Sequence, residues 1–208
     1  MAILTGTRRM IRRRVCETTW STAVGISGGQ NVTLRPGGGV ARCAGSGHAA
    51  EQHWEARMIT IGIRAAPKVV TFAIYDSGSR KVVNVEDIKI PLAFSPPDAL
   101  KYLRSNLLDL LREYKVTKAG IRASEPSAQN PSVERIQMEG VIQETFASSD
   151  LAAYYVGHIS SITSRAGIAR TDFKPMVAGE KSFDVDNWTD LSSVEREAVL
   201  CAVGAVNA

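Results

Sequence analysis

The feature that most constrains the fold is a change in the spacing of apolar residues near residue 95. Before it, the segments 58–63, 69–75 and 81–90 have the apolar patterns of β-strands and are joined by short turns. The segment 95–98 then reads Ser-Pro-Pro-Asp, with a serine suited to the N-cap and a proline suited to the first helical position. Apolar residues follow it at helical spacing, namely Leu100, Leu103, Leu107, Leu110, Leu111 and Tyr114. This order predicts an antiparallel meander followed by a helix.

The rest of the chain continues to alternate between strand and helix patterns. We predict a strand at 118–122, a polar loop at 124–130, a helix from Asn130-Pro131, a strand at 151–156, a short helix at 160–165, a mobile loop at 166–187 and a closing helix opened by the capping box of Ser192 and Glu195. The expected inner face of the helix after Pro131 is Met138, Val141, Ile142, Thr145 and Phe146, and that of the closing helix is Val194, Ala198, Cys201, Ala202 and Ala205. The predicted fold class is therefore α/β, with a mixed five-stranded sheet flanked by helices.

The positive charge of the chain lies in its first 57 residues. This leader holds eight Arg, no Lys, three Glu and no Asp, for a net charge of +5, and it shows no sustained periodicity. Residues 58–208 hold 17 Lys and Arg against 18 Asp and Glu, for a net charge of −1. The formal charge of +4 therefore gives no reason to assign nucleic-acid binding to the folded domain.

We expect residues 1–57 to form a disordered basic leader, separate from a domain at 58–208. The leader has three interpretations: a flexible arm that binds phosphates, a transit peptide, or an over-extended gene start. We favour the third, with Met58 as the true start, because a strand pattern begins at once there and because Glu55-Ala56-Arg57 can be encoded by purine-rich codons like those of a bacterial ribosome-binding site. A peptide spanning Ala56 to Thr60 in the native protein would contradict that interpretation.

Two further properties bear on location. The sequence has no apolar run of the roughly 18 residues that cross a bilayer, so we expect no membrane association. The three cysteines, Cys16, Cys43 and Cys201, lack zinc-site spacing, and we expect a reduced, cytoplasmic setting.

Three short motifs occur in an order that resembles a known fold. They are Ile61-Gly62-Ile63 in the first strand, Ala119-Gly120-Ile121 in the fourth and Glu197-Ala198-Val199-Leu200 in the closing helix. With the order of elements, they resemble the ribonuclease H-like superfamily, in particular RuvC-type Holliday-junction resolvases. The phrases at 113–116 and 138–143 are also similar to those of a small family of the same fold.

The resemblance implies phosphodiester cleavage by two Mg²⁺ ions held by carboxylates, and the sequence departs from that set. The acid of the first strand maps to Arg64, whose guanidinium cannot bind a metal. The second acid maps near Arg122 or Ala123, with Glu125 as the nearest carboxylate. The third maps to Glu197, while its companion one turn earlier is Val194.

Two hypotheses about function follow. In the first, the domain is a catalytically degenerate nuclease fold that binds nucleic acid or a partner, with Arg64 and Arg122 forming an anion site. In the alternative, it is an active Mg²⁺-dependent nuclease with a shifted ligand set, in which Glu125 and Glu197 are catalytic and bind the metal, assisted by Glu195 or Asp190. The two hypotheses share one geometric expectation, which is that Arg64, Glu125 and Glu197 converge at one edge of the sheet.

The remaining candidates have plainer interpretations. Arg64 at a strand end, Glu125 in a loop and Glu197 at the edge of the apolar helix face can each be a solvated charge with no role in a site. We expect His158 to be structural and Glu139 to be a surface charge, and Asp184, Asp186 and Asp190 to bind a cation at most weakly. A homodimer through the second helix would fit a resolvase-like architecture, but the sequence shows no apolar stripe that demands it.

Overall fold

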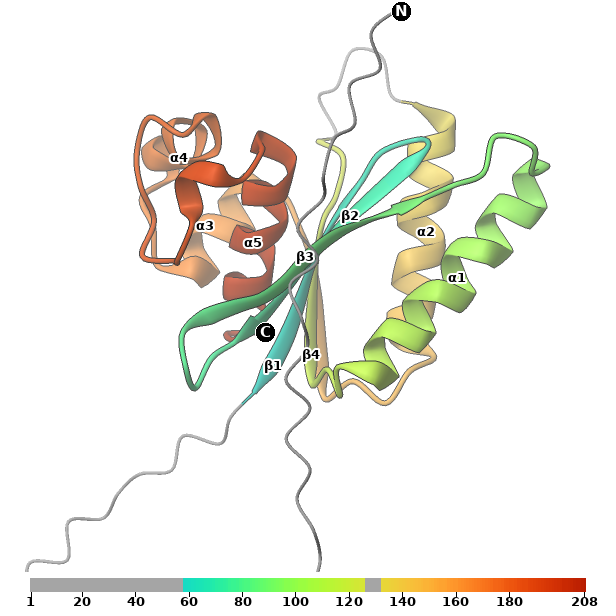
Figure 1. The fold of residues 1–208 in the computed structure, drawn as a ribbon, viewed down its shortest axis with the longest axis horizontal. Coiled ribbons are helices and arrows are strands. Elements are labelled where there is room, and N and C mark those ends of the chain that lie inside the picture. The colour runs from blue at the N-terminus through green and yellow to red at the C-terminus, as the bar shows by residue number, and fades with distance from the viewer. Residues whose placement is uncertain (1–57, 126–131) are drawn as a thin grey trace, which may run out of the picture. The chain divides into compact units, whose positions relative to one another are not determined.

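A computed structural model describes residues 58–125 and 132–208 of the chain; the leader lies outside the described residues. The described part consists of a five-stranded sheet with helices on both faces (Figure 1). Its elements are β1 (Ile59–Ala65), β2 (Val69–Asp76), β3 (Lys81–Lys89), α1 (Pro96–Glu113), β4 (Lys118–Arg122), α2 (Val133–Ala147), β5 (Ala153–Gly157), α3 (Ile159–Ala166), η1 (Arg170–Asp172), α4 (Phe173–Ala178), η2 (Trp188–Asp190) and α5 (Ser193–Ala205).

The sheet has the strand order β3-β2-β1-β4-β5 and is mixed, as the sequence predicts. β1, β2 and β3 form the antiparallel meander, whereas β4 pairs parallel with β1 and β5 pairs parallel with β4. Because β1, β4 and β5 run in the same direction, their carboxyl ends meet at one edge of the sheet, which we call the carboxyl edge. Side chains at the ends of these three strands are therefore brought together.

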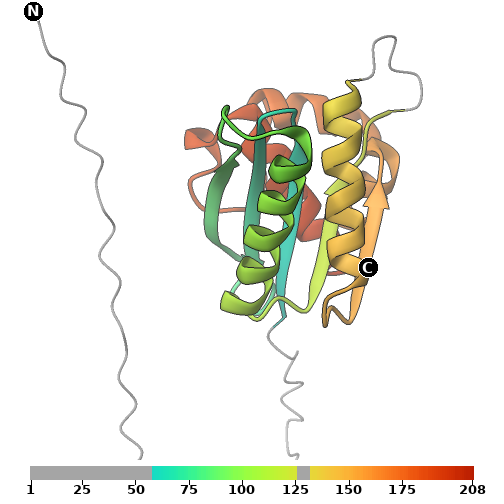
Figure 2. The same ribbon diagram turned by 90° about the vertical axis from the view of Figure 1, so that its right-hand side faces the viewer.

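The two faces of the sheet are covered by different helices. α1 and α2 pack on one face, and α5 lies on the other with α3 and α4 beyond it (Figures 1 and 2). The alternation of side chains along β1 decides which residue goes where. Ile61 and Ile63 join the core under α1 and α2, while Gly62 faces α5. Arg64 lies on the same side of β1 as Gly62, so its side chain is on the α5 face.

Gly62 lets α5 lie directly against β1. A Cβ atom at Gly62 would stand 2.1 Å from both the carbonyl oxygen of Ala198 and the backbone nitrogen of Ala202. No real Cβ atom tolerates such distances, so only glycine permits this contact. The close packing fixes α5 along β1 and brings Glu197, one residue before Ala198, to the end of that strand.

The segment 166–187 is ordered rather than the mobile loop that its composition predicted. It contains η1 and α4, and Phe173 and Met176 are buried in the core on the α5 side together with Trp188 of η2. Arg196 of α5 is itself buried and donates from its guanidinium to the carbonyl oxygens of Trp188, Val177 and Thr189 at 3.1 Å each. The prediction was wrong because these anchors are too widely and irregularly spaced to form a period.

Smaller differences concern element ends. The second helix begins at Val133, with Ser132 capping it through a hydrogen bond from the Arg135 N–H, and the predicted start at 130–131 lies outside the described residues. β5 begins two residues later than predicted. Val194 was expected on the inner face of α5 but is 42% exposed.

Among the described residues, no helix combines the length and apolar character needed to span a bilayer.

Candidate functional site at the carboxyl edge of the sheet

Two arginines lie side by side at the carboxyl edge. Arg64 of β1 and Arg122 of β4 are register partners in the parallel pair, and both side chains are on the face covered by α5. Their side chains are only 18% and 10% exposed. Two guanidinium groups so close in a partly buried place repel each other, so their arrangement requires anions nearby.

Glu197 of α5 supplies the first of these anions. The Arg64 Nε donates a hydrogen bond to Glu197 Oε2, and the Arg122 Nη1 lies 3.5 Å from the same oxygen. The Glu197 side chain is 15% exposed. One carboxylate therefore holds both strand-end arginines, and the interpretation of Glu197 as a solvated flanking charge is wrong.

Glu125 and His158 extend the chain of charges. The Arg122 Nη2 lies 3.8 Å from Glu125 Oε1, and that oxygen accepts a hydrogen bond of 3.3 Å from the backbone N–H of Ile159. His158 is the N-cap residue of α3, and its Nδ1 lies 3.7 Å from Glu125 Oε2. A carboxylate at the amino end of a helix is stabilised by the helix dipole, so the Glu125 position has a structural reason as well.

The predicted convergence of Arg64, Glu125 and Glu197 is therefore present. Arg122 connects the two carboxylates, since its two terminal nitrogens face Glu197 and Glu125 respectively. The interpretation of Arg64 and Glu197 as solvated charges does not describe the structure, whereas Glu125 lies in the loop after β4 with 35% of its side chain exposed. What they do chemically remains a prediction.

A second cluster lies beside the first and was missed by the sequence analysis. Glu139 of α2 is 5% exposed and accepts hydrogen bonds from Arg135 Nε at 2.7 Å, from the Ser124 backbone N–H at 3.1 Å and from the Ser124 hydroxyl at 2.9 Å. The expectation that Glu139 is a surface charge is wrong, because it ties the end of β4 to α2. Burial lowers the pKa of Arg135, and the neighbouring guanidinium of Arg64 lowers it further. Arg135 thus belongs to the same electrostatic environment as Arg64.

The combined site holds three arginines and three glutamates, yet its hydrogen bonding is incomplete. Arg122 Nε and Arg135 Nη2 are buried and have no hydrogen-bond partner among the described residues. A buried donor without an acceptor costs roughly 1–3 kcal/mol. An oxygen atom of a bound anion would relieve that cost, so the site has spare donors even though its formal charge is balanced. Arg122 is held in place on its other side by Phe173, whose ring centroid is 6.0 Å from the guanidinium carbon.

The residues present do not fit a pair of magnesium ions. Mg²⁺ binds oxygen ligands, and the candidates Glu125 and Glu197 both face Arg122. Arg64 brings a permanent positive charge to Glu197, where a cation would have to bind. Within residues 58–125 and 132–208, no group of three or more His, Cys, Asp and Glu side chains is arranged to hold a metal ion.

The auxiliary carboxylates of the shifted ligand set have other positions. Glu195 is engaged in the capping box, where its Oε2 accepts the Ser192 N–H at 2.6 Å. Asp190 lies in η2, and Asp186 pairs with Lys81 at 3.2 Å. Asp184, Asp186 and Asp190 therefore do not add ligands to Glu197. No pattern in the sequence points to Arg135, because its approach to Arg64 depends on how α2 packs at the end of β4.

Comparison with known proteins agrees with this architecture. No protein-family model matches the sequence, and no curated protein matches it. Among solved structures, Thermus thermophilus RuvC in complex with a Holliday junction substrate aligns with a TM-score of 0.53 and 12% identity over 71% of this chain and 91% of that one. The yeast mitochondrial Holliday junction resolvase Ydc2 aligns with a TM-score of 0.50 and 10% identity over 73% and 80% of the two chains.

These similarities establish the fold. The described domain has the ribonuclease H-like fold, and its topology matches the resolvases of that fold, as the short motifs predicted. At 10–12% identity the likeness extends to the architecture alone. The role of the carboxyl edge has to be argued from the side chains that this chain places there.

Proposed function

We propose that this domain is a catalytically inactive ribonuclease H-like domain that binds nucleic acid at the carboxyl edge of its sheet. The observation that carries the proposal is the pairing of Arg64 with Glu197, together with Arg122 against the same carboxylate. An arginine has taken the place of the first metal-binding acid that the resemblance implies, and it neutralises the carboxylate that such a metal would need. The fold is kept without the donor set for two-metal hydrolysis.

The same arrangement favours recognition of an anion. A guanidinium offers planar, directed donors that match phosphate oxygens, and Arg122 Nε and Arg135 Nη2 are not used within the described residues. Arg64 is the most accessible of the strand-end pair. Residues 58–208 carry a net charge of −1, so binding would depend on this local cluster and not on a general positive field. The Thermus RuvC structure contains a Holliday junction substrate, which makes a branched DNA the first ligand to test.

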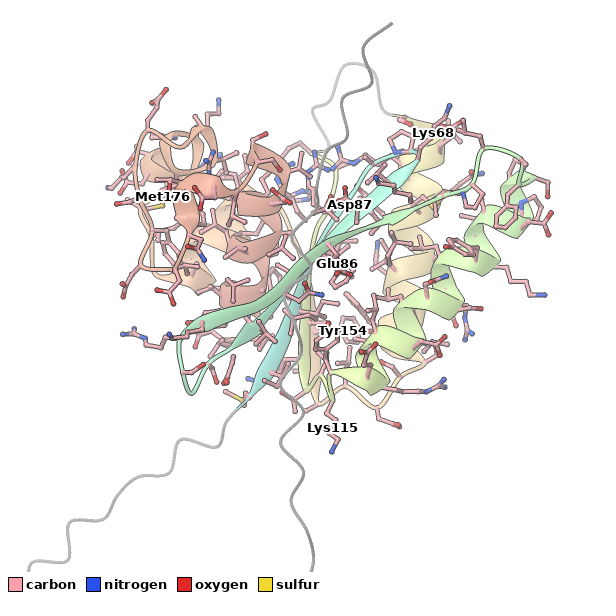
Figure 3. The ribbon with its side chains drawn as sticks, viewed as in Figure 1. Lys68, Glu86, Asp87, Lys115, Tyr154 and Met176 are labelled. Carbon is pink, nitrogen blue, oxygen red and sulfur yellow. The ribbon has the colours of Figure 1, made fainter. Side chains whose placement is uncertain are left out.

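Binding is tested with fluorescently labelled four-way junction, single-stranded and duplex DNA at low salt. We expect affinity to fall as salt is raised, because contacts to phosphate release counterions. Arg64→Ala is expected to weaken binding and to reduce the salt slope by about one. Lys115→Ala is the matched control, since Lys115 is exposed and lies at the opposite end of the domain from Lys68 and the turn that follows β1 (Figure 3).

Two results would contradict the proposal. One is the absence of binding to every DNA at low salt, and the other is an Arg64→Ala protein that binds as wild type does. Arg135→Ala serves as a second variant if Arg64→Ala lowers the melting temperature too far for a binding assay. Circular dichroism of each variant establishes that the fold is intact before binding is compared.

The alternative, an active Mg²⁺-dependent nuclease that uses Glu125 and Glu197, is tested on the same substrates. We expect no cleavage with Mg²⁺ or Mn²⁺. Cleavage by wild type that is lost in Glu197→Gln would replace the proposal with the alternative. Cleavage that persists in Glu197→Gln would point to a contaminating nuclease.

A homodimer through α2 gains support that the sequence did not offer. The buried residues of α2 face the sheet, but Val133 and Ile136 on its outward side are 68% and 48% exposed, and Gly140 beside them has open space around it. Val133 and Ile136 are one helical turn apart and form a small exposed apolar patch that a second copy of the helix could cover. We include a homodimer in the proposed assembly. Ile136→Glu should make it monomeric in light scattering, and a wild-type protein that is monomeric at high concentration would rule it out.

A further inference from the structure

A pocket on the other face of the sheet is not used by the arginine cluster. It has a volume of about 200 Å³ and lies between the β1–β2 turn, the segment that links β3 to α1, and the first turns of α2. Its walls are mostly apolar, with Ile90, Leu100 and Met138 among them, and Phe94 stands at the side. Phe94 is 41% exposed, and its ring packs edge-on against Tyr102 at a centroid distance of 5.4 Å.

The pocket and the arginine cluster are built on the same two segments. Lys68 lines the pocket and lies four residues after Arg64, in the turn that leaves β1. Glu134 also lines the pocket and directly precedes Arg135 in α2. Figure 3 shows Lys68 at the end of the domain where the amino terminus of α2 lies. A ligand bound along the carboxyl edge would therefore meet both features.

We propose that this pocket accepts one unstacked nucleobase of the nucleic acid whose phosphates bind the arginine cluster. The proposal rests on the proposed function and adds a second contact to it. The volume falls below the roughly 300–1,000 Å³ of pockets for drug-sized ligands, so it suits a single ring system. An exposed aromatic ring is the usual platform for a splayed base.

The rim of the pocket supplies polar groups as well. Lys68, Glu134 and Gln137 are exposed at its margin, and they offer a cation, a carboxylate and an amide. An amide and a carboxylate can hydrogen-bond to the edge of a base, while Lys68 can contact the adjoining phosphate. An apolar side chain of a protein partner would use the walls but would gain little from these groups.

The test compares two labelled single-stranded oligonucleotides that differ only in whether the central nucleotides carry bases or are abasic. We expect Phe94→Ala to weaken binding of the base-bearing oligonucleotide at least about fivefold, the low end for loss of one stacked base, and to leave the abasic one unchanged. Tyr154→Ala is the matched control, because Tyr154 is 43% exposed on β5 and does not line the pocket. Arg64→Ala should weaken binding of both oligonucleotides.

A measurement on unmodified protein covers the case in which Phe94→Ala does not fold. In a photocrosslinking experiment, an oligonucleotide that carries 5-iodouracil should become attached to the peptide containing Phe94. Crosslinks found only at other peptides would overturn the inference, and so would a Phe94→Ala effect of equal size on the two oligonucleotides. Unchanged oligonucleotide binding with an altered oligomeric state in Phe94→Ala would assign the pocket to protein contacts instead. If wild type binds neither oligonucleotide, the proposed function fails and this inference fails with it.

Discussion

The Nε of Arg64 donates to the carboxylate of Glu197 across the space between the end of β1 and the first turns of α5. The contact joins residues 133 positions apart and is mostly shielded from solvent, with side-chain exposures of 18% and 15%. It places a guanidinium directly against this carboxylate.

Removing Arg64 or Glu197 alone should destabilise the domain, and removing both should cost less than the sum of the two single changes. We expect Arg64→Ala and Glu197→Ala each to lower the free energy of unfolding by about 1–3 kcal/mol, because each leaves a partly buried charge with poorer compensation. The coupling in a double-mutant cycle should be about 0.5–3 kcal/mol. Urea denaturation of the four proteins measures it. A coupling within 0.3 kcal/mol of zero would show that the contact contributes nothing, as is common for solvated pairs.

Arg64→Asp should create a weak cation site that wild type lacks. The change removes the guanidinium that binds Glu197 and puts an oxygen ligand at the end of β1, while Arg122, 3.5 Å from Glu197, keeps the affinity of the new site low. Mn²⁺ at a concentration ten times its dissociation constant would stabilise the variant by about 1.4 kcal/mol, or a few degrees in melting temperature. The shift should vanish in the double variant that also carries Glu197→Gln. An equal shift in wild type would mean that Mn²⁺ binds elsewhere.

Two glycine-to-alanine changes should act in opposite directions. Gly62→Ala should prevent folding, because its Cβ would overlap the backbone of α5 at Ala198 and Ala202. Gly140→Ala should raise the free energy of unfolding by about 0.5–1 kcal/mol, since Gly140 lies within α2 and a Cβ there meets nothing within 4 Å. Expression and thermal melting compare the two. A folded Gly62→Ala protein would contradict the close approach of α5 to β1.

Arg196 should prove to be the anchor of the segment that was expected to be mobile. Its three hydrogen bonds to carbonyl oxygens hold α4 and η2 against α5, so Arg196→Met should cost about 2–4 kcal/mol. It should also speed proteolysis within 167–192. Arg104→Met is the control, because Arg104 pairs with Glu144 on the surface and its replacement should lower the free energy of unfolding much less. Equal costs for the two variants would show that the carbonyl contacts of Arg196 are of no special importance.

Burial of Cys201 should make the stability of the domain sensitive to alkaline pH. Burial raises the pKa of its thiol from 9.0 to about 12 in the folded protein. The unfolded chain therefore releases this proton from pH 9 upwards while the folded chain retains it, so stability that is complete below pH 9 is lost as pH rises towards 12. The loss approaches about 1.4 kcal/mol per pH unit from this group. In urea titrations, the free energy of unfolding of Cys201→Ala should decline less steeply between about pH 9 and 10.5 than that of wild type. Identical slopes for the two proteins would show that the Cys201 thiol is not the cause.

The sequence predicted the parts of the fold that depend on regular spacing. The strand meander and the leucine face of α1 have regular apolar spacing, the capping box of α5 is a short motif of fixed spacing, and all three are present. The placement of Arg64 and Glu197 followed from the resemblance, since their fold position is set by the strand and helix that carry them. The order of the segment 166–187 could not be predicted, because it depends on Phe173, Met176 and Arg196 meeting in three dimensions.

In the site, too, some residues follow from the sequence pattern and others only from three-dimensional packing. Arg64 and Arg122 end strands that the sequence identifies, so their neighbourhood follows from parallel pairing. The sequence does not identify Arg135 and Glu139 as site residues, because a charged residue buried on one side of a helix has the same sequence pattern as one on the surface. Only the packing of α2 against the end of β4 makes Glu139 a buried acceptor. Side chains that act across elements are thus the ones that sequence reasoning omits.

The register that sets Arg64 beside Arg122 also bears on how the domain is made. A nascent chain acquires both strands well before it acquires α5, which carries the glutamate between them. Until α5 is synthesised, Arg64 lacks the carboxylate that it binds in the folded domain, whereas Arg122 already has Glu125 nearby in the chain. Neutralisation of Arg64 therefore depends on a helix made well after both strands.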